Sequence, residues 1–597
     1  MELDFLVAAL LLWAVAMIEN IFLCRGTSPV RLAGAAVGYA VAAFAAVLPM
    51  IVAGHTPDRV PMVFAAAVSF VYQLAYPLLT RLGGGVRAGS PRGDADPAVG
   101  MCAFGLLSAM LLLGGPVAWP VGIIELGMTA AVIVQVAYYI MYGSAMDAYG
   151  YRLMTQTNTN EVIEFFRYYP WWLGAALCLT VAGVLCAAIW VNLPALPAHD
   201  GFEAVALMLA GILCALMLLA GGRRSLLARS GFASFHYAKL DNTRRLQAYA
   251  GRRAARRARV DARLLGAPYD GPSTIVLVVG ESANRDYMSA FVPELERDTT
   301  PWLAACRRDD ERHWTVFPHA YSCGMHTFVA LEQGFTQKNQ FDDLDFTTAT
   351  SFVDMAKAVG RRVHWYSNQG HLGASMSQVS VVAEEADEAL WTDQHPGLPP
   401  YDEELLPFLD RVDPTRDNLV VLHLKGNHFS FDNRYPPQAA VWTPAGPDDT
   451  VTTYMNSMRY VDDFLRRVWQ IGCERLNMKA MVYCSDHAII PDRHRGPTFG
   501  GFGDVRIPLA VWTSDDFIAA HPKRYEALKA NADRYWTNDF LYELMCGLMD
   551  VSSPRFRTSN SLAHGDYAYS REQLSVLGGT VRVADDDGHP DSLAGRS

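Results

Sequence analysis

The chain has 597 residues, a formal net charge of −11 and 51% hydrophobic residues. One hydrophobic core rarely extends over such a length, so at least two domains are expected. The acidic balance argues against a nucleic-acid partner, and ten cysteines without a paired CxxC pattern argue against a zinc ribbon or a thioredoxin motif.

Residues 1–221 are mostly apolar, whereas the remainder has the composition of a soluble α/β protein. A helix needs roughly 20 apolar residues to cross a bilayer. Seven runs meet or nearly meet this length, near 3–24, 30–53, 60–80, 98–118, 121–143, 171–193 and 203–220. Five or six spans are the alternative, because Gly and Pro residues between 114 and 120 make the fourth and fifth runs hard to separate. The sequence predicts a polytopic α-helical membrane domain over residues 1–222.

A basic stretch follows the last apolar run. Twelve Lys and Arg residues lie between Arg223 and Arg263. The positive-inside rule favours a cytoplasmic position for this stretch and for the domain after it. The alternative is that the stretch lies along the outer leaflet and contacts anionic headgroups. We treat residues 223–270 as a basic juxtamembrane linker whose side of the membrane these residues alone leave open.

An α/β domain is predicted over residues 271–570. Its expected strands are short apolar runs at 274–279, 361–366, 418–424, 479–484 and 507–512. Such strands alternating with helices predict a mostly parallel sheet covered on both faces. Ligands of these sheets bind at the carboxyl ends of the strands. The remaining residues, 571–597, are predicted to be a polar tail, disordered from about residue 583.

Polar side chains follow two of the predicted strands at the expected ligand edge. Glu281 follows the first strand, and Asp486 and His487 follow the fourth. Two carboxylates and an imidazole in one crevice suit a divalent metal, and mixed N and O ligands fit zinc. Each residue taken singly is more often a helix cap or a solvated side chain. Their shared position after apolar strands, with the segment Cys-Gly-Met-His-Thr (323–327) between them, favours the metal site.

Several ordered motifs resemble one known family. They are LVVGESANRDYMSAF and RDTTP within 277–301, VFPHAYSCGMHT (316–327), VLHLKGNHFSFDNRYPP (421–437), VYCSDH (482–487), and MTQTNTNEVIEFF (154–166) in the apolar half. These segments resemble the phosphoethanolamine transferases, a branch of the alkaline phosphatase/sulfatase superfamily. The resemblance covers roughly residues 100 to 560 and is closer to the branch acting on lipopolysaccharide core heptose than to the lipid A branch. It implies a C-terminal α/β sulfatase-like domain behind a membrane domain.

The resemblance also implies roles for individual residues. Glu281, Thr327, Asp486 and His487 would bind Zn²⁺, and Thr327 would be the nucleophile, with His326 and Ser322 as the nearby alternatives. Coordination to zinc lowers the pKa of a threonine hydroxyl enough to supply an alkoxide. The implied substrate-binding residues are His428, His494, Thr157, Glu161 and Asn368. For His428 the alternative is a loop histidine that only satisfies backbone groups.

The implied activity is a two-step transfer in a multi-pass protein of the bacterial inner membrane with a periplasmic catalytic domain. Thr327 would take phosphoethanolamine from phosphatidylethanolamine and pass it to a lipopolysaccharide or related glycan. The alternatives are a phosphoglycerol transferase or phosphodiesterase of the same superfamily, or an inactive membrane scaffold. A sulfatase proper is disfavoured because the nucleophile segment lacks Cys/Ser-x-Pro-x-Arg.

The sequence departs from the family pattern at one side of the site. Ala488, Ile489 and Ile490 follow His487 where the family usually has Gly-Glu, and His494 is the one nearby candidate for a second histidine. These departures concern the acceptor side and leave the four primary ligands intact. In an oxidising compartment Cys306 and Cys323 could form a disulfide.

Overall fold

The computed structural model describes residues 2–23, 29–56, 59–70, 96–142, 148–154, 172, 175–176, 178–183, 201–222, 225–229, 231–264, 269–369, 377–392, 401–446, 448–493 and 499–588. The chain divides into two compact units, Met1–Asn242 and Thr243–Ser597. We describe each unit by itself.

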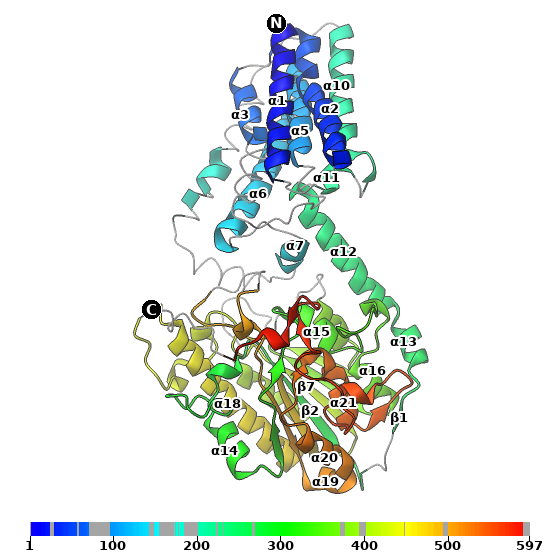
Figure 1. Cartoon of the computed structure of the whole chain (residues 1–597), viewed down its shortest axis with the longest axis vertical. Coiled ribbons are helices and arrows are strands. Elements are labelled where there is room, and N and C mark those ends of the chain that lie inside the picture. The colour runs from blue at the N-terminus through cyan, green and yellow to red at the C-terminus, as the bar shows by residue number, and fades with distance from the viewer. Residues whose placement is uncertain are drawn as a thin grey trace. The chain divides into compact units, whose positions relative to one another are not determined.

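The first unit consists of apolar helices (Figure 1). Its main helices are α1 (Glu2–Leu23), α2 (Pro29–Ala53), α3 (Arg59–Phe70), α5 (Asp96–Leu113), α6 (Trp119–Tyr142) and α10 (Gly201–Leu219). Two shorter helices are α7 (Ala148–Met154), between α6 and α10, and α11 (Leu226–Arg229), after α10. Gly105 of α5 lies at a close helix crossing, since an added Cβ would come within 2.6 Å of Ala45 O on α2 and 2.8 Å of Cys214 Sγ on α10. Small residues at such crossings let helix backbones pack directly.

Three helices in the described part are long and apolar enough to cross a membrane. They cover Leu32–Ala53, Gly115–Val136 and Gly201–Leu219. The helical membrane-type fold that the sequence predicts is confirmed. The predicted runs at 60–80 and 171–193 lie largely or partly outside the described residues, so the predicted number of spans stays a prediction.

A seven-stranded sheet in the order β3-β9-β8-β2-β7-β5-β6 forms the centre of the second unit. Its strands are β2 (Thr274–Gly280), β3 (Trp314–Val316), β5 (Arg362–Ser367), β6 (Glu388–Trp391), β7 (Asn418–His423), β8 (Met478–Ser485) and β9 (Leu509–Thr513). Neighbouring strands from β8 to β6 pair in parallel, while β9 runs antiparallel to both β8 and β3. The mostly parallel sheet and its five predicted strands are confirmed; β3 and β6 were too short to be recognised.

Helices cover both faces of this sheet (Figure 1). They are α14 (Pro301–Asp309), α15 (Thr327–Gly334), α16 (Phe352–Ala358), α17 (Gln378–Ala383), α18 (Thr450–Arg475), α19 (Asp515–Ala520), α20 (Pro522–Ala530) and α21 (Leu541–Leu548). The central strand β2 is fully buried. Its side chains alternate between two cores, with Leu277 in one and Val278 in the other. This double burial explains the continuous apolar run in the sequence.

The C-terminal segment packs onto the second unit as far as residue 588, which corrects the predicted polar tail. The short strands β12 (Ser575–Val576) and β13 (Val581–Arg582) pair there. Two further short pairs lie elsewhere in the unit, β1 (Arg263–Leu264) with β11 (Val551–Ser552) and β4 (Ala320–Tyr321) with β10 (Trp536–Thr537). Val583 is buried in the core, and Asp586 forms an ion pair with the buried Arg506. A few apolar side chains and one ion pair hold a segment whose composition is otherwise polar.

The basic stretch is part of the second unit from residue 243 onward, along the end of α12 (Gly231–Gly251) and α13 (Arg253–Arg259). Arg256 is 3% exposed and pairs with two buried carboxylates, Glu385 and Asp354. Its guanidinium lies 3.5 Å from the centre of the Tyr249 ring. Burial, together with the charge of Asp354, raises the pKa of Glu385 to about 8. Arg256 thus lies between two buried carboxyl groups and offsets their mutual repulsion.

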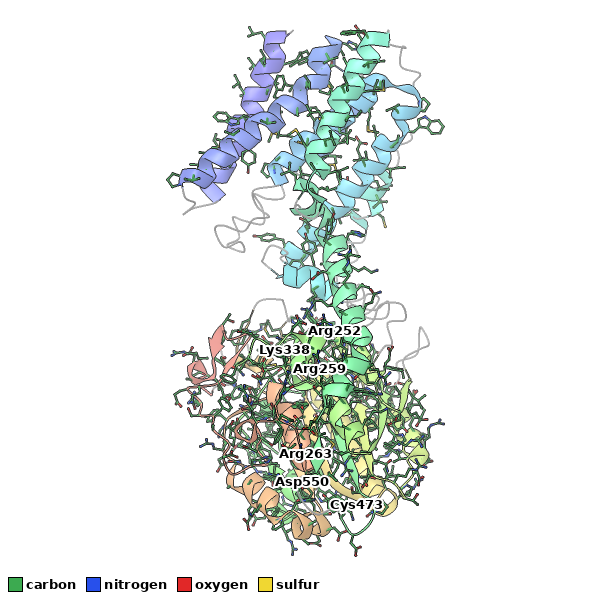
Figure 2. All side chains as sticks on the ribbon, turned by 90° about the vertical axis from the view of Figure 1, so that its right-hand side faces the viewer. Arg252, Arg259, Arg263, Lys338, Cys473 and Asp550 are labelled. Carbon is green, nitrogen blue, oxygen red and sulfur yellow. The ribbon has the colours of Figure 1, made fainter. Side chains whose placement is uncertain are left out.

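Neighbouring arginines of the same stretch also have partners (Figure 2 marks its course with Arg252, Arg259 and Arg263). Arg245 pairs with Glu332 of α15 at 3.1 Å, and Arg252 donates to Thr347. The carbonyl oxygen of Glu385 accepts hydrogen bonds from Arg253 at 2.9 Å and from Arg257 at 3.2 Å. Five of the twelve basic residues thus have a structural role, so a cytoplasmic location is not needed to explain them.

Replacing Arg256 with alanine should destabilise the second unit by about 3 to 5 kcal/mol, because Glu385 would stay buried without its ion-pair partner and Asp354 would keep only Arg257, 3.8 Å away. Urea unfolding of the full-length protein in detergent, followed by tryptophan fluorescence, measures this loss. Arg263→Ala is the control, since the Arg263 side chain is 76% exposed and pairs with an exposed Asp261; its midpoint should stay unchanged. Equal midpoints for the two variants would contradict the prediction.

Candidate active site

The register of β2 and β8 brings two carboxylates together. These strands pair in parallel with Gly280 opposite Ser485, so the residues that follow them, Glu281 and Asp486, are neighbours at the carboxyl edge. His487 Nε2 lies 3.1 Å from Glu281 Oε1 and 3.3 Å from Asp486 Oδ2. All three side chains are buried, and one potential ligand atom of each lies within 4.8 Å of the others.

Thr327 completes this cluster from the helix α15. Its Oγ1 donates to Glu281 Oε2 at 3.0 Å and lies 3.4 Å from His487 Nε2. Thr327 is half-buried, unlike the three side chains behind it. It is the first residue of α15, and a helix N-terminus favours negative charge there. The four predicted metal-binding residues are therefore brought together around the one hydroxyl that faces outward.

The loop after β7 supports Glu281 from the other side. Asn427 N donates to Glu281 O at 2.9 Å. Gly426 has φ +50, and a Cβ at this position would lie 2.9 Å from both the N and the O of Glu281. Asp402 fixes the loop by accepting from Lys425 N at 2.7 Å and from Gly426 N at 2.9 Å. A glycine is required here because the loop backbone passes directly against the backbone of Glu281.

Asn538 and Ser322 connect the Thr327 segment to the end of β8. Asn538 Nδ2 donates to Asp486 O at 2.6 Å, and its Oδ1 accepts from Cys323 N at 2.9 Å. Ser322 is buried, with Oγ 2.6 Å from Asp486 O. Its hydroxyl is therefore occupied by the backbone, which makes it a poor alternative nucleophile.

Ser282 adopts a left-handed backbone conformation, φ +59, directly after Glu281. Its N–H donates to Asp486 Oδ1 at 3.0 Å and its hydroxyl to Glu281 Oε1 at 2.8 Å. Tyr454 holds this turn by donating to Ser282 O at 2.8 Å. Strained residues persist only where the surroundings hold them, and here the strain directs two donors at the carboxylates.

The charges of the cluster match a bound cation. Burial opposes ionisation of Glu281, but the charge of His487 and hydrogen bonds from it outweigh burial and hold the pKa of Glu281 well below its usual range. Burial, and then the negative Glu281, raises the pKa of Asp486 well above its usual range. The buried Asp486 Oδ2 accepts no hydrogen bond from the described residues, and its ion-pair partner is His487 Nε2 at 3.3 Å. A divalent metal facing this oxygen would let both carboxylates ionise, so these residues fit a metal ion.

The predicted substrate-binding residues are placed less completely. His428 lies in the loop after β7, and its N–H donates to Lys425 O at 3.1 Å; its charge contributes to the low pKa of Glu281. Asn368 is buried and donates to Asp402 Oδ1 at 2.8 Å, so its amide supports the loop. The other three, His494, Thr157 and Glu161, lie outside the described residues.

Gln369 is a site residue that sequence reasoning missed. Its Nε2 donates to Glu281 Oε2 at 3.2 Å and to Leu424 O at 2.7 Å. It follows Asn368 at the end of β5, so the rule that pointed to Asn368 could also have found it. Asn538 gave no such signal because it follows a two-residue strand outside the main sheet.

The disulfide considered for Cys306 and Cys323 is not formed. Both cysteines are free, and Cys323 is buried. Its Sγ lies 3.8 Å from Ala330 O, so the thiol packs inside the turn of α15. Cys323 is therefore held near Thr327 by packing against α15 and not by a disulfide bond.

Comparison with known proteins identifies the second unit. Residues 273–551 match the model of the sulfatase family. The second unit therefore contains a sulfatase-like domain over these residues. The resemblance seen in the motifs is confirmed, and the buried cluster lies at the carboxyl edge of the sheet of this sulfatase domain.

Curated relatives are phosphoethanolamine transferases at modest identity. Phosphoethanolamine transferase EptC of Escherichia coli K12 is 28% identical over 275 residues, 42% of this chain and 47% of the relative. CptA of Salmonella typhimurium is 25% identical over 321 residues, 50% and 54% of the two chains. Kdo(2)-lipid A phosphoethanolamine 7''-transferase of the same species is 27% identical over 312 residues, 48% and 54%. The chain thus spans about half the length of the curated relatives it matches.

One solved structure shares the fold beyond the sulfatase domain. The integral membrane protein lipooligosaccharide phosphoethanolamine transferase A from Neisseria meningitidis superimposes with a TM-score of 0.57 at 20% identity. The match covers 84% of this chain and 98% of that one. The similarity extends to a helical membrane unit followed by a sulfatase-like domain.

Removing Asp486 and His487 together should abolish metal binding, because the double alanine variant loses two of the three buried ligands. Elemental analysis of the purified full-length protein gives the metal content. The matched control replaces Asp310 and His313, a half-exposed pair 2.6 Å apart, and should keep its metal. Undiminished stoichiometric metal in Asp486→Ala/His487→Ala would rule out this site.

Proposed function

We propose that the chain is a zinc-dependent phosphoethanolamine transferase that carries phosphoethanolamine on Thr327 from phosphatidylethanolamine to a lipopolysaccharide or related glycan. The observation that carries this proposal is the contact of Thr327 Oγ1 with Glu281 at 3.0 Å and with His487 at 3.4 Å. The curated relatives supply the transferred group, since each of the first seven is named a phosphoethanolamine transferase.

The two steps form and break one bond each. Thr327 Oγ1 gives up its proton and attacks the phosphorus of the donor; the bond to the diacylglycerol oxygen breaks, and that oxygen takes up a proton and leaves as a hydroxyl. An acceptor hydroxyl, which gives up its proton, or an acceptor phosphate then attacks the same phosphorus; the Thr327 Oγ1–P bond breaks, and Thr327 Oγ1 takes up a proton. Splitting one displacement in two lowers each barrier.

The residues of this chain prepare the nucleophile. Bound Zn²⁺ supplies the positive charge that lowers the pKa of the hydroxyl and offsets negative charge on the phosphoryl oxygens. Glu281 Oε2 accepts the hydrogen bond of Thr327 and so orients its oxygen. Backbone N–H groups at the start of α15 can bind an anionic phosphoryl oxygen. The rest of the donor would bind on the β7 and β5 side of the cluster, where His428, Asn368 and Gln369 lie.

Two alternatives differ in identifiable ways. A phosphoglycerol transferase or phosphodiesterase of the same superfamily would use the same cluster with another headgroup or with water. An inactive scaffold is disfavoured because Thr327 still contacts Glu281 and His487, although Ala488-Ile489-Ile490 departs from the family pattern.

Thr327→Ala should reduce transfer by at least about 10³-fold, because the variant lacks the attacking oxygen. Thr327→Ser is the matched control and should keep measurable activity. Incubation with phosphatidylethanolamine followed by peptide mapping should find the adduct on Thr327. An adduct on His326 or Ser322, or undiminished turnover of the alanine variant, would contradict the mechanism.

We also propose that the chain is a multi-pass inner-membrane protein with its sulfatase domain in the periplasm, where a lipopolysaccharide acceptor is presented. The three apolar helices support membrane insertion. The arginines that favoured a cytoplasmic side have partners within the folded unit, and long domains are translocated largely regardless of charge.

An alkaline phosphatase reporter joined after residue 270 should therefore be active. A reporter that fluoresces only in the cytoplasm, joined at the same residue, should stay dark. The opposite pair of results would overturn both the topology and the proposed acceptor.

A further inference from the structure

Glu125 of α6 is the buried acidic side chain in the described part of the first unit. It is 0% exposed, and it is the only charged residue of the apolar span Gly115–Val136. It lies midway along this span, roughly 15 Å from each end at 1.5 Å per residue. A glutamate side chain is too short to reach the aqueous phase from this depth.

The carboxylate of Glu125 lacks a partner. Neither of its oxygens forms a hydrogen bond with a described residue. Two hydroxyls on neighbouring helices are also buried without a partner in the described chain, Ser69 Oγ of α3 and Ser108 Oγ of α5. Buried polar groups are nearly always hydrogen-bonded, so three such groups on helices that contact one another indicate a missing ligand.

Helix packing brings these groups to one interface. Leu111 of α5 and Val121 of α6 belong to one buried cluster, to which α3 also contributes. Ser108 precedes Leu111 by about one turn and Glu125 follows Val121 by about one turn, so they share the faces that meet there. The short connection between α5 and α6 makes these helices antiparallel. Ser108 and Glu125 therefore lie at a similar depth, and Ser69 of α3 borders the same interface.

The described helices supply no positive charge for this carboxylate. No charged residue in the described chain lies close enough to act on Glu125 electrostatically. The helices that pack against α6 are α3 and α5. Their only charged residues, Arg59 and Asp96, stand at the first position of each helix. A buried carboxylate needs a cation or a proton, so here the positive charge comes from a ligand.

We propose that Glu125 anchors a binding site for a single positive charge, a proton or Na⁺, completed by the hydroxyls of Ser69 and Ser108. One carboxylate balances one positive charge, which favours a monovalent ion over a divalent one. Hydroxyl and carboxylate oxygens suit a hard cation, and a protonated carboxyl can donate to a hydroxyl. Either form removes the net charge from the centre of the span. The site belongs to the helices of the first unit and is independent of the transfer reaction.

Dicyclohexylcarbodiimide tests this site in the wild-type full-length protein in detergent. This apolar reagent requires a protonated carboxyl: the proton passes to a carbodiimide nitrogen, and the carboxyl oxygen bonds to the central carbon. In mildly acidic, sodium-free buffer, peptide mapping should find the adduct on Glu125. Glu203, in the first turn of α10, is the matched carboxyl at the end of a span and should stay unlabelled.

Sodium chloride distinguishes the two cations. If Na⁺ binds, a saturating concentration should slow the labelling of Glu125 at least about tenfold, because an occupied site holds no proton. Choline chloride at the same concentration should not slow it. In that case Ser108→Ala should weaken the protection by Na⁺ and keep the adduct. Labelling that neither salt slows identifies the proton as the bound cation.

Two results would overturn the proposal. One is the absence of an adduct on Glu125 in the sodium-free buffer, which would reveal an ionised carboxylate with a partner of its own. The other is equally fast labelling of Glu203, which would show that the reagent does not select the buried site. The metal content and the adduct on Thr327 report on the sulfatase domain, so failure of the proposed function leaves this result standing.

Discussion

The pairing of β2 with β8 brings two carboxylates together at one buried point. The residues around the site stabilise this unfavourable arrangement. Gly280 pairs with Ser485, so the residues that follow them, Glu281 and Asp486, must lie side by side. Two like charges in a dry site disfavour ionisation. The N–H and hydroxyl of the strained Ser282, the imidazole of His487 and the amide of Gln369 each reduce that cost. One oxygen of Asp486 still accepts no hydrogen bond from the part of the chain that the structure describes, and a metal ion would bind there.

The sequence predicted the part of this site that depends on strand ends. Glu281, Asp486 and His487 follow long apolar strands, and strand ends in a parallel sheet share an edge, so their proximity follows from the chain itself. Thr327 lies at the start of a short helix, and only its motif pointed to it. Asp402 and Asn538 come from segments with no regular pattern. Their contribution depends on tertiary packing, which local sequence does not encode.

The limits of the second unit illustrate the same point. Composition placed residues from 571 onward in a tail, yet Leu574, Val576 and Val583 reach the core. Composition likewise assigned residues 223–270 to a linker, while Arg256 is buried between Glu385 and Asp354. A count of charges or apolar residues treats every side chain as solvated. It fails where a few side chains find buried partners far away in sequence.

The free cysteines of the sulfatase domain have a consequence for how the protein matures. Cys323, Cys484 and Cys546 are buried thiols, and Cys473 is an exposed one (Figure 2). Because its described thiols are free, this domain is stabilised by packing and ion pairs. A reductant does not break these interactions. Its folding should need no thiol-oxidising helper and should proceed equally in reducing and oxidising compartments. The three buried sulfurs are shielded from peroxide, so oxidative damage would begin at Cys473.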